Sequence, residues 1–126
     1  MTSQRVVVTG SRGLLGSVVT EKLRHRGHEV LELDLALGHN LRDESFVREW
    51  FSKNPADSLV NMFALNDHVR DAPRGESFLD VSLESFEDYL AVNVTALFSV
   101  CREFIRSNAT GSIVNASSIY GWRSPR

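Results

Sequence analysis

Four short apolar runs alternate along the chain with segments whose apolar residues recur at helical spacing. Runs rich in β-branched residues indicate buried strands, whereas a period of three to four residues indicates a helix. This pattern predicts strands over 5–9, 29–34, 58–63 and 112–117, and helices over 14–26, 44–53 and 82–107. Strands that alternate with helices form parallel sheets with right-handed crossovers, so residues 1–126 are predicted to be one α/β domain.

Residues that start and stop helices support these boundaries. Gly27 suits a left-handed stop after the first helix, Asp43 can cap the second, and Pro55 ends it. The polar segment 65–81 has no steady period and contains proline and glycine, which predicts an irregular loop at the carboxyl edge of the sheet. Residues 122–126 are predicted to form a loop as well.

The first strand runs directly into a glycine-rich turn that opens the first helix. Backbone amides at such a helix N-terminus bind phosphate, although a tight turn without a ligand is the alternative. Gly10 is predicted to allow the turn, Gly13 the approach of a pyrophosphate, and Gly16 the close packing of the helix. The predicted phosphate-binding residues are Gly10, Ser11, Arg12, Gly13, Leu14, Leu15 and Gly16.

An acidic residue follows the second strand at the distance that a dinucleotide site requires. Asp34 lies 18 residues after Gly16, where a carboxylate accepts hydrogen bonds from the adenosine ribose hydroxyls. A solvated aspartate at a strand end is the alternative. Asp34 would repel the 2′-phosphate of NADP, which favours NAD. The Arg12 guanidinium is the opposing signal, because it could reach that phosphate, the pyrophosphate or only solvent.

Composition narrows the possible partners, the cellular compartment and the possible metal sites. The 126 residues carry a net charge of −2 without a basic stripe, so nucleic acid is not expected as a partner. No long apolar run or signal peptide is evident, which predicts a cytoplasmic protein without a membrane partner. The single Cys101 lies in a helical apolar pattern and is predicted to be a core residue. His39 lacks neighbours at metal-ligand spacing, so no metal site is expected.

Several motifs stand in the order typical of the short-chain dehydrogenase/reductase family, which the chain resembles over nearly its whole length. They are the glycine-rich turn, Asp34, Asn40-Leu41, Leu59-Val60-Asn61, Val92-Asn93-Val94, and Gly111 to Gly121. The resemblance implies a Rossmann-like doubly wound parallel sheet with flanking helices, incomplete at its C-terminal end. It also implies an NAD(P)-dependent oxidoreductase that transfers hydride between nicotinamide and an alcohol or carbonyl substrate.

The resemblance also implies roles for particular residues. The pair Asn40-Leu41 would lie along the adenine ring, and the segment Asn61-Met62-Phe63-Ala64 would approach the nicotinamide ribose, where the family usually has Asn-Asn-Ala-Gly. Asn93 would interrupt a helix hydrogen bond and hold a water in a proton relay. Ser118 would polarise the substrate oxygen. A polar helix residue bonded to backbone and a turn serine are the respective alternatives.

Two departures refine the resemblance. The short step from Asp34 to Asn40 and the glycine spacing are similar to nucleotide-sugar reductases and epimerases of the extended branch, which suggests a sugar or nucleotide-sugar substrate. Residues 66–70 include His68 and Arg70, which suit an anionic or sugar-phosphate group, although a solvated loop is the alternative.

The family's catalytic tyrosine and lysine fall beyond Arg126, and Tyr120 stands too close to Ser118 to replace that tyrosine. The expectation is therefore a cofactor-binding part that is inactive by itself. A non-catalytic dinucleotide-binding module or regulator is the alternative. A helix that packs beside 82–107 in the family would also be missing. We therefore expect exposed apolar residues on 82–107 and a homo-oligomer for the full-length protein.

Overall fold

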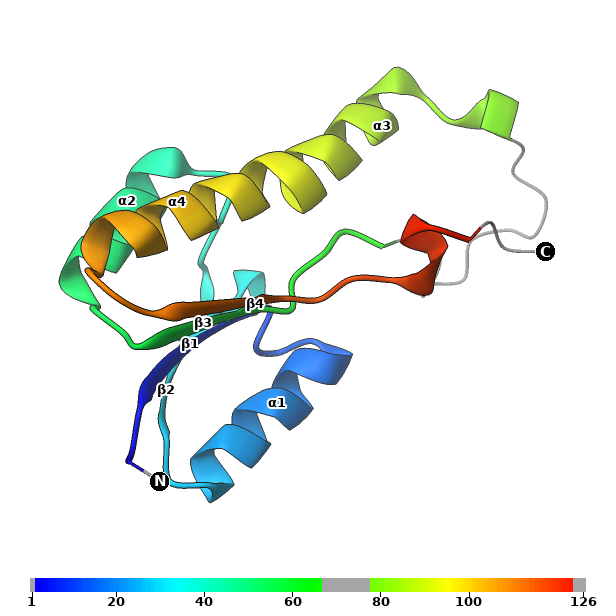
Figure 1. Ribbon diagram of the computed structural model, residues 1–126. Coiled ribbons are helices and arrows are strands. Elements are labelled where there is room, and N and C mark those ends of the chain that lie inside the picture. The colour runs from blue at the N-terminus through cyan, green and yellow to red at the C-terminus, as the bar shows by residue number, and fades with distance from the viewer. Residues whose placement is uncertain (1, 67–77, 124–126) are drawn as a thin grey trace.

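A computed structural model describes residues 2–66 and 78–123, which form a parallel four-stranded sheet with helices on both faces (Figure 1). The strands are β1 (Arg5–Thr9), β2 (Glu29–Leu33), β3 (Ser58–Asn61) and β4 (Ser112–Asn115). The helices are α1 (Leu14–His25), α2 (Glu44–Lys53), α3 (Leu83–Leu90) and α4 (Leu97–Ser107). Short 3-10 turns cover Leu35–Leu37, Phe78–Asp80 and Ile119–Gly121.

The strand order β2-β1-β3-β4 reverses the direction of winding between β1 and β3. The chain moves outward from β1 to β2 through α1, then returns past β1 to β3 through α2. As a result, α1 lies on one face of the sheet, and α2 and α4 lie on the other (Figure 1). The predicted doubly wound parallel fold is confirmed. In such sheets the carboxyl ends of the two strands at the reversal border the ligand crevice.

The core lies between the sheet and the α2–α4 layer. Val7 and Leu59, on the two central strands, are fully buried with the Phe51 ring of α2 and the Phe104 ring of α4. These two rings meet edge to face with their centroids 6.2 Å apart. The apolar faces of α2 and α4 therefore cover one face of the sheet, as their helical spacing predicted.

Three strands end earlier than predicted. The paired register of the sheet stops at Thr9, Leu33, Asn61 and Asn115, so the predicted extensions of the last three strands were wrong. β2 and β3 lose their shared partner where β1 turns away at Gly10, and β4 pairs only with β3. Helix α2 matches its prediction, and α1 ends one residue early, followed by Gly27 at φ +84°.

The predicted continuous helix over 82–107 was wrong in one respect. It begins where predicted, and Ser82 caps it, with the hydroxyl accepting from the amide of Ser85 at 3.1 Å. Residues Ala91–Ala96, however, form a π-helical segment that separates α3 from α4. Such segments are wider than an α-helical turn and change which hydrogen bonds the backbone makes. Asn93, predicted to be a site residue, lies inside it.

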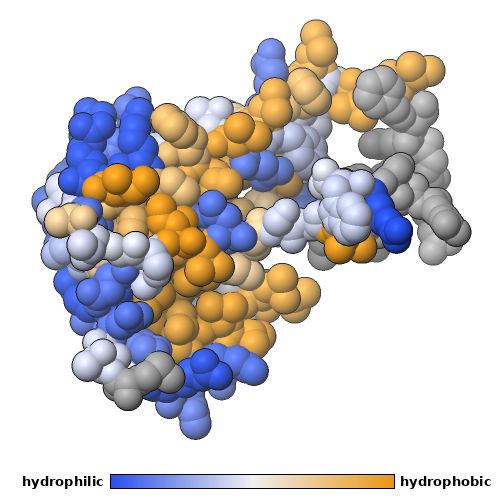
Figure 2. All heavy atoms as spheres, viewed as in Figure 1, coloured by the Kyte–Doolittle hydropathy of each residue, from blue (hydrophilic) through white to orange (hydrophobic). Residues whose placement is uncertain are grey.

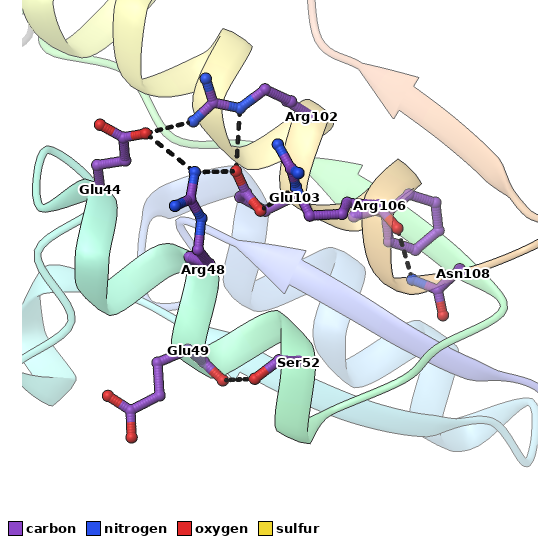
Figure 3. Close-up of polar contacts among 9 residues, drawn as sticks. Glu44, Arg48, Glu49, Ser52, Arg102, Glu103, Arg106 and Asn108 are labelled. Atoms are coloured by element: carbon purple, nitrogen blue, oxygen red, sulfur yellow. Dashed lines mark hydrogen bonds and ion pairs between the residues drawn. The ribbon is translucent and has the colours of Figure 1, made fainter.

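A buried carboxylate joins α2 to α4 (Figure 3). The Glu103 side chain is 1% exposed and lies 2.9 Å from Arg102, 3.0 Å from Arg106 and 3.6 Å from Arg48 of α2. Burial by itself raises the pKa of Glu103. The hydrogen bond from Arg102 and the charges of the three arginines outweigh it, so the pKa is lowered. Glu44 of α2 completes the cluster by pairing with Arg102 at 2.8 Å.

Several apolar side chains of the helices are exposed among the residues that the structure describes. Figure 2 shows them gathered over α3 and the start of α4. The expectation of exposed apolar residues here is confirmed for Phe86, Leu90, Val94, Phe98 and Ile105. No helix within 2–66 and 78–123 is long and apolar enough to cross a membrane.

Cys101 is partly buried and packs against the core, consistent with the predicted structural role. Burial raises the pKa of its thiol, and hydrogen bonds with Asn61 and Asn115 only partly oppose that rise. The thiol is therefore poorly suited to act as a nucleophile.

Candidate cofactor-binding site

The glycine-rich turn crosses the carboxyl ends of three strands. Gly10 adopts φ +64°, and a Cβ atom there would lie 2.6 Å from the backbone nitrogen of Phe63, just beyond β3. Its own amide donates to the carbonyl of Leu33 at the end of β2, at 2.8 Å. A side chain at Gly10 would thus be both conformationally strained and in collision with backbone. The turn lies at the reversal of winding between β1 and β3.

Helix α1 packs directly against this turn. A Cβ atom on Gly16 would lie 1.8 Å from the carbonyl oxygen of Gly10, so only glycine allows this approach. Gly13 precedes the helix and has no side-chain cap, while Leu14 and Leu15 point to solvent. The first turn of α1 therefore presents backbone N–H groups that no capping side chain covers. Such an N-terminus fits a phosphate group.

Asp34 joins the end of β2 to the glycine-rich turn. One carboxylate oxygen accepts from the backbone amide of Arg12 at 2.8 Å, and the other accepts from the amide of Ala36 at 2.8 Å. The second bond caps the 3-10 turn that leads to Gly38, which has φ +82°. The aspartate and the turn are thus brought together as the spacing predicted, although the bond to the Arg12 amide was not foreseen.

Glu32, a charged residue in the apolar run of β2, was not predicted to be a site residue. Its carboxylate lies 3.0 Å from Arg12 Nε and 2.7 Å from Arg24 of α1, and its side chain is 13% exposed. Burial by itself raises the pKa of Glu32, but the bond and charge of Arg24 together with the charge of Arg12 lower it overall. A carboxylate two residues before Asp34, on the same face of an extended strand, was the available signal.

Glu32, Arg12 and Arg24 line a cleft of about 230 Å³ on the α1 side of the turn. Its other lining residues are Ser11, Ser17, Thr20 and Glu21. The cleft therefore lies next to the glycine-rich turn and is lined by charged and hydroxyl side chains.

Side-chain hydrogen bonds join the carboxyl ends of β1, β3 and β4. Asn61 is 3% exposed, and its amide oxygen accepts from the Thr9 hydroxyl at 2.9 Å while its amide nitrogen donates to Asn115 at 2.8 Å. The Asn61 side chain is thus used within the sheet. Of the residues that follow it, Phe63 packs partly against the core and Ala64 is exposed.

Asn93 clamps the loop that leaves β3. Its amide oxygen accepts from the backbone nitrogen of Leu65 at 2.7 Å, and its amide nitrogen donates to the carbonyl of Leu65 at 3.0 Å. The side chain therefore satisfies both backbone groups of one loop residue, 28 positions earlier in the chain. The side-chain amide of Asn93 is thus bonded to the backbone of a distant loop, and the role of Asn93 in a proton relay stays a prediction.

The remaining predicted residues differ in their exposure. Ser118 is exposed beyond the end of β4, and its carbonyl accepts from Gly121 at 2.9 Å. Asn40 is exposed and accepts from the amide of Arg42 at 3.1 Å, whereas Leu41 is buried in the core. His68 and Arg70 lie outside the described residues. Within the described residues, no three His, Cys, Asp or Glu side chains form a group that could hold a metal ion.

Solved structures share this fold at low sequence identity. A small-chain dehydrogenase superposes with a TM-score of 0.82 at 18% identity, over 98% of this chain and 64% of its own length. A short chain dehydrogenase from Leptospira borgpetersenii with bound NAD+ gives 0.82 at 18% identity, over 100% and 56%. The dTDP-4-dehydrorhamnose reductase of Bacillus anthracis, in complex with NADP, gives 0.66 at 15% identity, over 89% and 35%. The chain therefore spans less than two thirds of each of these proteins.

Comparison with curated proteins found no match. The model of the NAD dependent epimerase/dehydratase family matches residues 6–126, which include the glycine-rich turn, β2, β3, β4 and all of β1 except Arg5. This match covers nearly the whole sequence, and the fold agrees with it. The chain belongs to the NAD dependent epimerase/dehydratase family.

Proposed function

We propose that this chain is the cofactor-binding part of an NAD-dependent oxidoreductase that acts on an alcohol or carbonyl group. The observation that carries the proposal is the junction of Asp34 with the glycine-rich turn, through the 2.8 Å bond to the Arg12 amide. This junction brings a carboxylate suited to ribose hydroxyls next to a helix N-terminus suited to a pyrophosphate. Membership in the family and the bound dinucleotides named for two of the similar structures support a nicotinamide dinucleotide.

The residues present fit such a cofactor. The absence of side chains at Gly10 and Gly16 lets the turn pack closely against β3 and α1. Gly13 has no capping side chain, so the amides at the N-terminus of α1 can face a phosphate. Bound there, the dinucleotide would supply a hydride acceptor or donor. Asp34 would accept from the ribose hydroxyls, which favours NAD over NADP because a carboxylate repels a 2′-phosphate.

We assign the other predicted cofactor contacts to the two halves of the dinucleotide. The Phe63 backbone approaches Gly10 just after β3, and Phe63 with the following Ala64 would contact the nicotinamide half of the cofactor. Asn40 is exposed after the Asp34 turn, which suits the adenine half. Because Leu41 is buried, its role in this proposal is to hold the Asn40 backbone in place rather than to contact the ring directly.

Ser118 and Asn93 have different roles in the reaction that we propose. The exposed Ser118 hydroxyl, beyond the carboxyl end of β4, would donate a hydrogen bond to the substrate oxygen and stabilise negative charge that develops there. Asn93 would hold the Leu65 backbone, and so the loop beside the substrate, in a fixed position. A sugar or nucleotide-sugar substrate is supported by the family and by the reductase among the similar structures.

Binding and turnover test different parts of this proposal. Titration of the chain with NADH should show saturable binding, and absence of binding would overturn the proposal as a whole. In the natural full-length protein, Ser118→Ala should lower kcat by about 100-fold or more with little change in NADH affinity. Ser117→Ala removes the adjacent exposed hydroxyl and serves as the matched control. Normal turnover of Ser118→Ala would exclude the catalytic role. Binding without any turnover would favour a dinucleotide-dependent regulator.

A further inference from the structure

We infer that Glu32 helps set the cofactor preference by holding the Arg12 guanidinium away from the position of a 2′-phosphate. The inference rests on the proposed function, since it requires a dinucleotide whose adenosine ribose lies at Asp34. It adds a residue and a mechanism to that function. Asp34 repels the 2′-phosphate directly. Glu32 assists by binding the Arg12 guanidinium, which would otherwise attract that phosphate.

Arg12 bridges the two acidic residues. Its backbone amide donates to Asp34 at 2.8 Å, while its guanidinium bonds Glu32 through Nε at 3.0 Å and through Nη2 at 3.3 Å. Both guanidinium contacts go to the one carboxylate, one to each of its oxygens. This paired arrangement is the strongest that arginine forms with a carboxylate, and it is the same arrangement that arginine forms with a phosphate. The side chain of Arg12 therefore engages Glu32 with the donors that a phosphate would need.

The position of Arg12 makes this competition relevant to cofactor choice. NADP differs from NAD by a phosphate on the adenosine ribose, next to the hydroxyl groups for which Asp34 is the acceptor in the proposed site. Asp34 has extended backbone angles, so its side chain and that of Glu32, two residues earlier, lie on the same face. The Arg12 backbone is bonded to Asp34, and its half-exposed guanidinium, on a flexible stem, is bonded to Glu32, two residues before the proposed ribose acceptor.

The environment of Glu32 strengthens its hold on Arg12. The Glu32 side chain is 13% exposed, whereas that of Arg12 is 52% exposed. A largely buried carboxylate interacts more strongly with a cation than a solvated one does, and it is destabilised when a partner leaves. Arg24 also binds Glu32, at 2.7 Å. The two arginines and the two acidic residues, Glu32 and Asp34, are therefore balanced in formal charge. Removal of the Glu32 charge would leave this group with a net positive charge.

The test compares the dissociation constants of NADPH and NADH for four forms of the chain. They are the wild type, Glu32→Gln, Arg12→Gln and the double variant. Glu32→Gln should lower the ratio of the NADPH constant to the NADH constant by about tenfold, mainly through tighter binding of NADPH. Addition of Arg12→Gln to Glu32→Gln should remove most of that gain. Glu29→Gln is the matched control, because Glu29 pairs with Arg5 at 3.1 Å near the other end of β2.

Failure of this inference and failure of the proposed function give different results. If the wild type binds neither dinucleotide, the proposed function fails and this inference fails with it. If the wild type binds NADH but Glu32→Gln leaves the ratio unchanged, only the inference is overturned. Arg12→Gln in the otherwise wild-type chain provides a test that does not need Glu32→Gln to fold. A selective loss of NADPH affinity of about tenfold in that variant would show that Arg12 already serves the phosphate, which contradicts the inference.

Discussion

The carboxylate of Asp34 accepts a hydrogen bond of 2.8 Å from the backbone amide of Arg12, which fixes the end of β2 to the glycine-rich turn. This bond links a residue that follows one strand to the loop that follows its neighbour. The relative position of the two predicted halves of the site, ribose acceptor and phosphate cradle, is therefore set by the folded chain.

Removal of the Asp34 charge should weaken NADH binding. Asp34→Asn retains a similar shape but accepts less strongly, and we expect the dissociation constant of NADH to rise by about tenfold or more. Asp57→Asn is the matched control, because Asp57 likewise accepts from a backbone amide, that of Arg5, at 2.8 Å beside the N-terminal end of β1. Equal effects of the two substitutions, measured by NADH fluorescence, would contradict the proposed ribose site.

Addition of a single methyl group at Gly16 should destabilise the protein. Alanine is favoured over glycine inside a helix by about 1 kcal/mol, but here its Cβ would overlap the carbonyl of Gly10. We expect Gly16→Ala to lower the free energy of unfolding by about 2 kcal/mol or more in urea denaturation. Gly121→Ala provides the control, since no atom lies within 4 Å of the added Cβ. A Gly16→Ala variant as stable as the wild type would show that the turn and α1 pack less closely.

The Glu103 cluster should make stability depend on pH. The pKa of Glu103 is lowered in the folded protein, below the ordinary value of 4.5. Its contribution is therefore complete above that ordinary value and is lost as the pH falls through the lower, folded-state pKa. We expect thermal melts to show this loss in the wild type and much less of it in Glu103→Gln.

At neutral pH, Glu103→Gln should lower the free energy of unfolding by about 3 kcal/mol, because three arginines would lose their shared buried carboxylate. The control is Glu49→Gln, which breaks only a solvent-exposed pair with Lys53. The same melting temperature for Glu103→Gln as for the wild type would contradict a stabilising role for the cluster.

Asn93 should protect the backbone of Leu65. Asn93→Ala removes both hydrogen bonds to that residue, so the Leu65 amide should exchange its hydrogen faster, by about tenfold for each 1.4 kcal/mol lost. Asn108→Ala is the matched control. The Asn108 side chain also makes two hydrogen bonds to backbone, accepting from the Ala56 amide and donating to the Phe104 carbonyl, near the N-terminal edge of the sheet. Unchanged exchange at Leu65 in Asn93→Ala would show that other contacts hold this loop.

The order of the elements and the edge that carries the site could be predicted because they depend on local patterns. Short apolar runs predicted the four strands, and the glycine spacing together with Asp34 predicted the turn. Strand ends could not be predicted, since they depend on the shared register that stops at Thr9 and Asn61.

Long-range pairing accounts for the features that were missed. The hydrogen bonds of Asn93 with Leu65 and the ion pair of Glu103 with Arg48 join residues far apart in sequence. The bond between Arg12 and Glu32 likewise spans 20 positions, so the side chain judged able to reach a phosphate is already engaged. Local spacing placed Glu32 on the same face as Asp34, but it does not identify the partner of either residue.

The most direct test of the account is an NMR titration of the isotope-labelled chain with NADH. We predict saturable shifts of the backbone amides of Gly13, Leu14 and Leu15, at the N-terminus of α1, and of Asp34. Amides near Asn108, close to the N-terminal edge of the sheet, should remain unchanged. Absence of saturable shifts, or shifts confined to the edge near Asn108, would contradict the central claim that this chain binds a nicotinamide dinucleotide at its glycine-rich turn.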